Sequence, residues 1–152
     1  MITVVAALVE RGGRMLICQR RRGDHFAFKW EFPGGKVRAG ETLQQGLARE
    51  LSEELGVAHD AISIGREVYR TRHRYSEVTE EIALVFFAAQ LPAASLKNLA
   101  FERIEWAPLA ALPGYDFLPA DRELVAQLAR GALRVAEPNG KATGNTRASV
   151  VS

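Results

Sequence analysis

The most regular pattern in this chain is GKVRAGETLQQGLARELSEELGV, which runs from Gly35 to Val57. It contains four leucines spaced four residues apart, at Leu43, Leu47, Leu51 and Leu55. This spacing places them along one face of an α-helix. Thr42, with Gln45 three residues later, forms a capping-box pattern, and Gly56 is the residue type that commonly follows the end of a helix. The sequence therefore predicts an amphipathic helix between Thr42 and Gly56.

Three glutamates lie on the same predicted helix, beside the leucine face. With about 100° between successive residues, Glu50, Glu53 and Glu54 fall within an arc of about 100°. Carboxylates three and four residues apart repel one another by roughly a few tenths of a kcal/mol per pair. A divalent cation would turn that repulsion into attraction, and hard oxygen ligands suit Mg²⁺ or Mn²⁺, which commonly bridge to substrate phosphates. The glutamates therefore predict a metal site for a phosphate ester, although a glutamate-rich face is also typical of solvated surface.

Helix and strand signals alternate along the rest of the chain. A β-branched run at Thr3 to Val5, the turn Arg11 to Arg14 and an apolar run from Met15 to Gln19 predict an N-terminal hairpin. Further strands are expected over residues 63–75, 78–89 and 103–107, and a second helix from Pro119. With 152 residues the chain has room for one mixed α/β domain, expected over residues 1–133. Residues 134–152 lose periodicity and are expected to form a flexible C-terminal tail.

Composition and charge narrow the classes of function. With 47% hydrophobic and 25% charged residues, the composition is that of a soluble globular domain. The formal net charge of +2 is too small for a general nucleic-acid-binding field, so no nucleic-acid polymer is expected as a partner. No apolar run approaches the roughly 20 residues that span a bilayer, and residues 2–9 lack the features of a signal peptide. With Cys18 as the one cysteine, we expect a cytoplasmic protein without a disulfide or a membrane partner.

The acidic helix and its surroundings resemble the signature of a known family. The pattern Gly, five residues, Glu, seven residues, Arg-Glu-aliphatic-x-Glu-Glu-x-Gly-aliphatic is satisfied in full by Gly35, Glu41, Arg49, Glu50, Leu51, Glu53, Glu54, Gly56 and Val57. With average residue frequencies, a chance match in a chain of this length is on the order of 10⁻⁸ to 10⁻⁷. The stretch resembles the Nudix box, and the chain is similar to Nudix hydrolases.

This resemblance implies a fold and an activity. Nudix hydrolases are α/β/α sandwiches around a mixed β-sheet, and they cleave a nucleoside diphosphate linked to another group with Mg²⁺ or Mn²⁺. By the resemblance, Glu50, Glu53 and Glu54 and the backbone carbonyl of Gly34 would hold the metal. Glu53 would act as general base and Arg49 would orient the carboxylates.

Two further glutamates, outside the group of three on the helix, have separate expected roles. Glu41 is expected to fix the junction between loop and helix. Glu102 is the nearest candidate for an additional metal ligand that MutT-like members carry before the last strand, although its spacing to Trp106 differs by two residues from the expected pattern. It could equally be a surface charge.

The resemblance extends to the MutT-type nucleoside triphosphate pyrophosphohydrolases through two further segments, Trp30 to Lys36 and Phe117 to Asp121. Carried over by position, the predicted substrate contacts are Arg20, His25, Glu31, Phe32, Pro33, Gly34, Lys36 and Asp121. Lys36 would face the phosphates and Asp121 would read the base. Phe86 and Phe87 are both candidates to stack on the base, although neighbouring strand residues face opposite sides. An exposed loop would equally explain His25 and the run Arg20 to Arg22.

The sequence is compatible with two classes of nucleotide substrate. An ionised Asp121 suits the paired N–H donors of guanine, which favours 8-oxo-dGTP and a role in cleansing the nucleotide pool that protects DNA. The segment Pro-Ala-Asp instead resembles relatives that act on CTP, dCTP or 5-methyl-dCTP, and cytosine needs a protonated Asp121.

Two other readings are disfavoured. Arg72 stands where ADP-ribose hydrolases carry a proline. A nucleotide-sensing binding module is the alternative from another class, but such modules usually carry a fused DNA-binding domain. The predicted product pair is a nucleoside monophosphate and pyrophosphate, formed by a monomer or weak homodimer.

Overall fold

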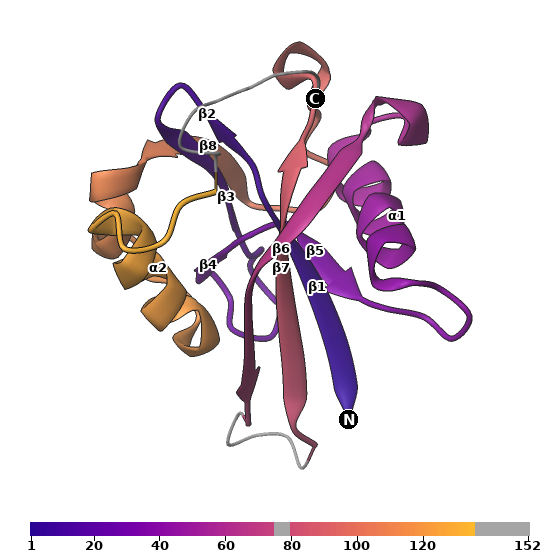
Figure 1. Cartoon of the computed structure of the whole chain (residues 1–152), viewed down its shortest axis with the longest axis horizontal. Helices are drawn as coiled ribbons and strands as arrows, with labels where there is room; N and C mark the ends of the chain where they lie inside the picture. Colours follow the sequence, from indigo (N-terminus) through magenta and orange to yellow (C-terminus); the bar gives the residue numbers. More distant parts are fainter. Residues whose placement is uncertain (75–79, 136–152) are drawn as a thin grey trace.

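The computed structural model describes residues 1–74 and 80–135, which form a mixed α/β fold (Figure 1). Its strands are β1 (Ile2–Leu8), β2 (Glu10–Arg11), β3 (Arg14–Gln19), β4 (Trp30–Glu31), β5 (Gly34–Lys36), β6 (Ser63–His73), β7 (Ile82–Gln90) and β8 (Arg103–Pro108). Its α-helices are α1 (Leu43–Leu55) and α2 (Arg122–Ala129). Short 3₁₀ turns are η1 (His59–Ala61), η2 (Ala93–Ser95), η3 (Leu109–Gly114) and η4 (Pro119–Asp121).

The larger sheet has the strand order β5-β1-β7-β6. Strands β1 and β7 are parallel, with Ile2 opposite Ile82 and Leu8 opposite Ala88, while β5 and β6 run antiparallel to their neighbours. The sheet is therefore mixed, as the sequence predicted.

The N-terminal hairpin is smaller than the sequence predicted. Strand β1 does not pair with β3 as expected but belongs to the larger sheet. The short strand β2, of two residues, pairs with β3 instead. Strand β3 also pairs with β4 and β8, which makes a second sheet. The prediction was wrong because β1 gains a full parallel register with β7, a pairing between segments far apart in the chain that no local turn signal reveals.

The two helices cover opposite sides of the larger sheet, and the alternation along β7 shows why (Figure 1). Leu84 and Phe86 pack with the buried residues of α2, whereas Val85 and Phe87 pack with those of α1. Neighbouring side chains on a strand point to opposite faces, so one apolar strand supplies both cores. This arrangement confirms the predicted α/β fold with helices on both faces of a mixed sheet.

The predicted helices and strands lie close to their expected positions. Helix α1 has the predicted capping box, since Thr42 accepts a hydrogen bond from the Gln45 backbone and Gln45 accepts one from the Thr42 backbone. Gly56 ends the helix in the left-handed conformation, with a φ of 67°. The second helix opens with the turn η4 before α2 begins at Arg122.

Some of the predicted segments extend beyond the residues that the structure describes. Val135 packs into the core, and residues 136–152 of the expected tail lie outside the described residues. Residue 75 of the expected strand 63–75 and residues 78 and 79 of the expected strand 78–89 lie outside them as well. Among the helices of the described part, none is both long enough and apolar enough to cross a membrane.

Candidate active site

One cavity is lined by most of the residues that the sequence predicts to contact the substrate. It has a volume of about 400 Å³ and lies along the first half of β1 and β7, between the β3–β4 loop, β5 and η4. The predicted residues that line it are Arg20, His25, Glu31, Phe32, Gly34, Lys36, Glu54 and Asp121. Pro33 is buried and does not line it, but its carbonyl accepts a hydrogen bond from the Ala7 backbone over 2.8 Å. The cavity therefore joins the acidic helix to the predicted base-reading residue.

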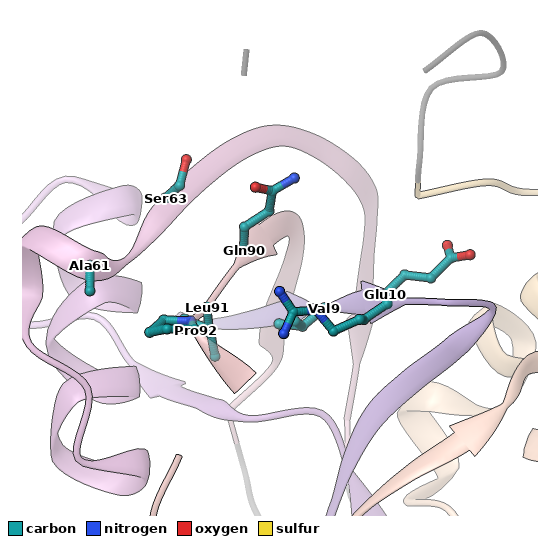
Figure 2. A pocket seen from close by; sticks show the side chains of 8 residues that line it. Val9, Glu10, Ala61, Ser63, Gln90, Leu91 and Pro92 are labelled. Atoms are coloured by element: carbon teal, nitrogen blue, oxygen red, sulfur yellow. The ribbon is translucent and has the colours of Figure 1, made fainter. Parts of the chain in front are cut away.

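A second hollow, of about 390 Å³, lies at the other end of β1 and β7 (Figure 2). Val9, Glu10, Ser63 and Gln90 are among the residues that line it. None of the site residues predicted from the sequence lines this hollow.

Arg49, on helix α1, is the centre of a network of charged side chains. It is 13% exposed, and its guanidinium donates to Glu41 over 2.6 and 3.1 Å and to Glu50 over 3.0 Å. It also donates to the backbone carbonyl of Lys36 over 3.0 Å, which ties α1 to β5. The hydrogen bonds from Arg49 lower the pKa of Glu41 to about 2. The loop, the strand and the helix are thus held together by one side chain.

Two adjacent glycines of β5 allow close approach of its two neighbours, α1 and β1. A side chain at Gly35 would overlap the carboxyl group of Glu50, and one at Gly34 would overlap the backbone of Val5 and Ala6. The backbone N–H of Gly34 donates to Glu54 over 3.1 Å. Gly35 therefore makes room for the Glu50 carboxyl group, Gly34 makes room for β1, and the Gly34 backbone holds Glu54.

Glu50 and Glu54 form a pair of carboxyl groups beside the cavity. Partial burial, together with the charges of Glu50 and Glu31, raises the pKa of Glu54 to about 9. Two carboxylates that converge in a partly buried site are unfavourable by themselves, and a divalent cation is the natural partner of such a set of hard oxygens. The residues present therefore fit the divalent metal that the sequence predicts.

Glu53 lies apart from this pair. Its side chain is 52% exposed, and its carboxylate contacts Arg49 at 3.4 Å and Arg38 at 3.9 Å. Among the described residues, no three acidic, histidine or cysteine side chains gather closely enough to hold a metal ion. The structure thus brings together two of the three predicted acidic ligands.

Glu102 lies just before β8 and is exposed. Its backbone N–H donates to the carbonyl of Gln19 over 2.8 Å, and its side chain does not line the cavity. The structure does not bring this residue to the cavity.

Asp121 is buried in the wall of the cavity, with 3% of its surface exposed. Burial first, and the charge of Glu31 second, raise the pKa of this carboxyl well above its usual range. No other described residue hydrogen-bonds to its side chain, although buried polar groups almost always have a partner. Burial therefore favours the protonated form of this carboxyl group, and its polar atoms are available to a ligand.

Arg20 and Glu31 form an ion pair in the cavity wall, with two contacts of 3.2 Å. Burial nevertheless raises the pKa of Glu31, and Arg20 acts in the opposite direction. The Arg20 guanidinium also donates to the backbone carbonyl of His25 over 2.7 Å, so the ion pair anchors the β3–β4 loop to the wall.

Phe86 and Phe87 face opposite sides of the larger sheet, because neighbouring side chains on a strand alternate. Phe86 lines the cavity, whereas Phe87 packs beneath α1. Phe26, Leu84 and Leu118 are among the lining residues that the sequence did not predict. A signal for Leu118 was present in the segment Phe117 to Asp121, but no local pattern points to Phe26.

Comparisons with known proteins agree with this site. The model of the NUDIX domain matches residues 1–128. A Mycobacterium tuberculosis protein that is provisionally named 8-oxo-dGTP diphosphatase 2 is 38% identical over 127 residues, which cover 84% of this chain and 87% of the relative. The CTP pyrophosphohydrolase of Escherichia coli is 53% identical over 57 residues, or 38% of this chain and 42% of the relative.

A solved structure shows the same fold. The solution structure of the E. coli ORF135 protein superimposes with a TM-score of 0.67 at 34% identity, over 91% of this chain and 94% of that one. Nudix hydrolases generally use divalent metal ions, which agrees with the paired carboxylates beside the cavity. The intact signature, the fold and the family match together show that this chain belongs to the Nudix hydrolases.

Proposed function

We propose that this chain hydrolyses a nucleoside triphosphate to a nucleoside monophosphate and pyrophosphate, with Mg²⁺ or Mn²⁺ as cofactor. One observation carries the proposal: a single cavity is lined by the acid Glu54, which pairs with Glu50, by the cation Lys36 and by the buried acid Asp121. A nucleotide has the matching halves, with a charged phosphate chain and a base that carries donors and acceptors.

The metal would be held by Glu50 and Glu54, with the carbonyl of Gly34 as a further ligand. A bound divalent cation would offset the charge that develops on the phosphates and make water more acidic. Glu53 is proposed as the general base that accepts a proton from the attacking water. Its exposure of 52% leaves it accessible to solvent, and its carboxylate contacts Arg49 and Arg38. Lys36 would pair with the phosphates.

For the base, we propose 8-oxo-dGTP as the leading substrate, because full-length relatives bear the name 8-oxo-dGTP diphosphatase. A neutral carboxyl offers one donor and one acceptor. It can donate to O6 and accept from N1–H of a guanine edge.

Cytosine nucleotides are the second candidate. In its protonated form, which burial favours, the Asp121 carboxyl can accept from N4–H and donate to N3 of cytosine. The E. coli CTP pyrophosphohydrolase, 53% identical over 57 residues, also supports this class.

The test is kcat/KM with Mg²⁺ for 8-oxo-dGTP, dGTP, dCTP and 5-methyl-dCTP, measured from the release of monophosphate and pyrophosphate. Preference for 8-oxo-dGTP over dGTP supports nucleotide-pool cleansing, and preference for either cytosine nucleotide supports the second candidate. Nucleotide binding without turnover would instead favour the sensing module.

The variant Asp121→Asn sharpens the assignment of the base-reading group. An amide has one donor and one acceptor side, like a neutral acid. The variant should therefore keep the order of the four substrates at neutral pH. A changed order would show that Asp121 binds the base in its ionised form.

A further inference from the structure

Two bulky residues in the β3–β4 loop have left-handed backbone conformations. Phe26 has a φ of 59° and Phe28 a φ of 66°, and they are the two non-glycine residues with positive φ in ranges 1–74 and 80–135. An aromatic residue rarely adopts this conformation, which persists only where the surrounding structure imposes it. The loop therefore stores strain at two positions six and eight residues after Arg20.

Hydrogen bonds within the loop impose the conformation. The backbone of Arg20 exchanges hydrogen bonds with the loop, donating to Lys29 and accepting from Phe28, each over 2.9 Å. The backbone N–H of Lys29 donates to the carbonyl of Phe26 over 3.2 Å. Because the Arg20 side chain also pairs with Glu31, the loop is fixed directly to the cavity wall.

The two strained phenylalanines differ in what their side chains contact. Phe26 is half-buried and lines the cavity, with its ring edge-on to that of His25 at 4.4 Å between centroids. Phe28 is 41% exposed, does not line the cavity, and lies under the guanidinium of Arg22 at 5.7 Å. The strain thus brings one aromatic ring to the cavity and leaves the other on the surface.

The cavity beyond Phe26 fits a flat aromatic group. Leu84, Phe86 and Leu118 give it apolar walls, while Asp121 is a buried hydrogen-bonding group that none of the other described residues satisfies. A nucleobase needs hydrogen bonds at its edge and apolar contact on its faces. An aromatic ring meets the second need for every base, because each base has a π-face.

We propose that Phe26 is a substrate-binding residue that stacks on the nucleobase and strengthens binding of the nucleoside part whichever base it carries. This inference rests on the proposed function, since it assumes that a nucleotide occupies the cavity. It assigns different tasks to two side chains. Asp121 distinguishes between bases, whereas Phe26 holds any of them.

The test is calorimetric titration of dGMP, dCMP and ribose 5-phosphate into the native protein and into the variants Phe26→Leu, Phe26→Tyr and Phe28→Leu. Leucine keeps much of the apolar volume but removes the ring, and tyrosine restores the ring. Phe28→Leu is the matched control, because it changes the same residue type, with the same backbone strain, in the same loop. Ribose 5-phosphate lacks the base, so its binding reports the sugar and phosphate contacts alone.

We expect Phe26→Leu to raise the Kd of dGMP and of dCMP by about tenfold, the range that loss of base stacking gives. Ribose 5-phosphate should bind this variant as it binds the native protein, and Phe26→Tyr and Phe28→Leu should stay within about twofold. With triphosphates, Phe26→Leu should raise KM and leave kcat nearly unchanged, since stacking contributes equally to ground and transition states.

Several outcomes would overturn the inference. They are unchanged monophosphate binding in Phe26→Leu, an equal loss for ribose 5-phosphate, an equal loss in Phe28→Leu, or no monophosphate binding by the native protein. Failure of the proposed function looks different: the native protein would bind dGMP or dCMP normally yet hydrolyse no triphosphate. The titrations would then still decide the role of Phe26.

Discussion

At the scale of the residue, Asp121 couples stability to pH. Its pKa is raised in the folded protein, from an unfolded value near 3.8. The folded state therefore favours the protonated form, so the contribution of this residue to stability is complete below pH about 4 and is lost as pH rises towards the folded pKa. Ionising the carboxyl in the folded protein means placing an unpaired charge in the core.

The variant Asp121→Asn should remove this dependence. Compared with the variant, the native protein should lose up to about 1.4 kcal/mol of unfolding free energy per pH unit above pH 4. Urea denaturation of both proteins at pH 5, 6, 7 and 8 measures the difference, and the comparison cancels the effects of other groups. Parallel profiles would show that Asp121 titrates normally.

Glu53 gives a second prediction at this scale. Its replacement by glutamine keeps the size of the side chain but removes the proposed proton acceptor, so kcat should fall by about 10²- to 10⁴-fold. The exposed Glu123 on α2 serves as the control, and Glu123→Gln should keep native activity. Near-native kcat in Glu53→Gln, with unchanged circular dichroism, would exclude Glu53 as the base.

At the scale of the element, the contact between α1 and β5 depends on Gly35. An added methyl group at this position would displace the carboxyl group of Glu50. We expect Gly35→Ala to fold but to lose about 10²-fold in kcat/KM, because a shift of about 1 Å in a catalytic group has that effect. Gly114→Ala is the control, since a side chain there meets open space. Equal activity in the two variants would show that the close approach is unimportant.

Helix α1 also shows which features a sequence can predict. Its capping box, its leucine spacing and its final glycine are local signals, and they located the helix to the residue. The strand pairing of β1 could not be predicted in this way, because its partner β7 lies far along the chain. Likewise, helical periodicity placed Glu53 on the face of Glu50 and Glu54. It could not reveal that the Glu53 carboxylate contacts Arg38, outside the helix, and lies apart from the other two glutamates.

The same contrast between local signals and long-range contacts applies to the candidate site. The signature motif identified the acidic helix and its glycines because each residue type has a local steric or ionic reason. The raised pKa of Asp121 and the strained backbone of Phe26 depend on burial and on loop hydrogen bonds, which arise only after distant segments have packed. The sequence therefore predicted the acidic helix beside the cavity better than the surroundings of Asp121 and Phe26.

At the scale of the whole molecule, the paired carboxylates link stability to the metal. A cation that binds only the folded state stabilises it by about 2.7 kcal/mol at 100 times its Kd. We expect Mg²⁺ to raise the melting temperature of the native protein and EDTA to reverse this. Glu54→Gln removes the carboxyl group whose pKa is raised in the folded protein, and with it the cost of protonating that group at neutral pH. EDTA-treated Glu54→Gln should therefore melt higher than the native protein and respond little to Mg²⁺. An equal response to Mg²⁺ in both proteins would place the ion elsewhere.

The parallel pairing of β1 with β7 also bears on how the chain is made. A ribosome releases residues 2–8 first and helix α1 soon afterwards, but both need β7, which ends at Gln90, before they can pack. The leucines of α1 therefore stay without the partners Val85 and Phe87 during much of synthesis. Long-range pairing of this kind slows folding and prolongs the exposure of apolar surface. A nascent chain arrested before β7 would thus carry the complete signature motif yet have no folded site.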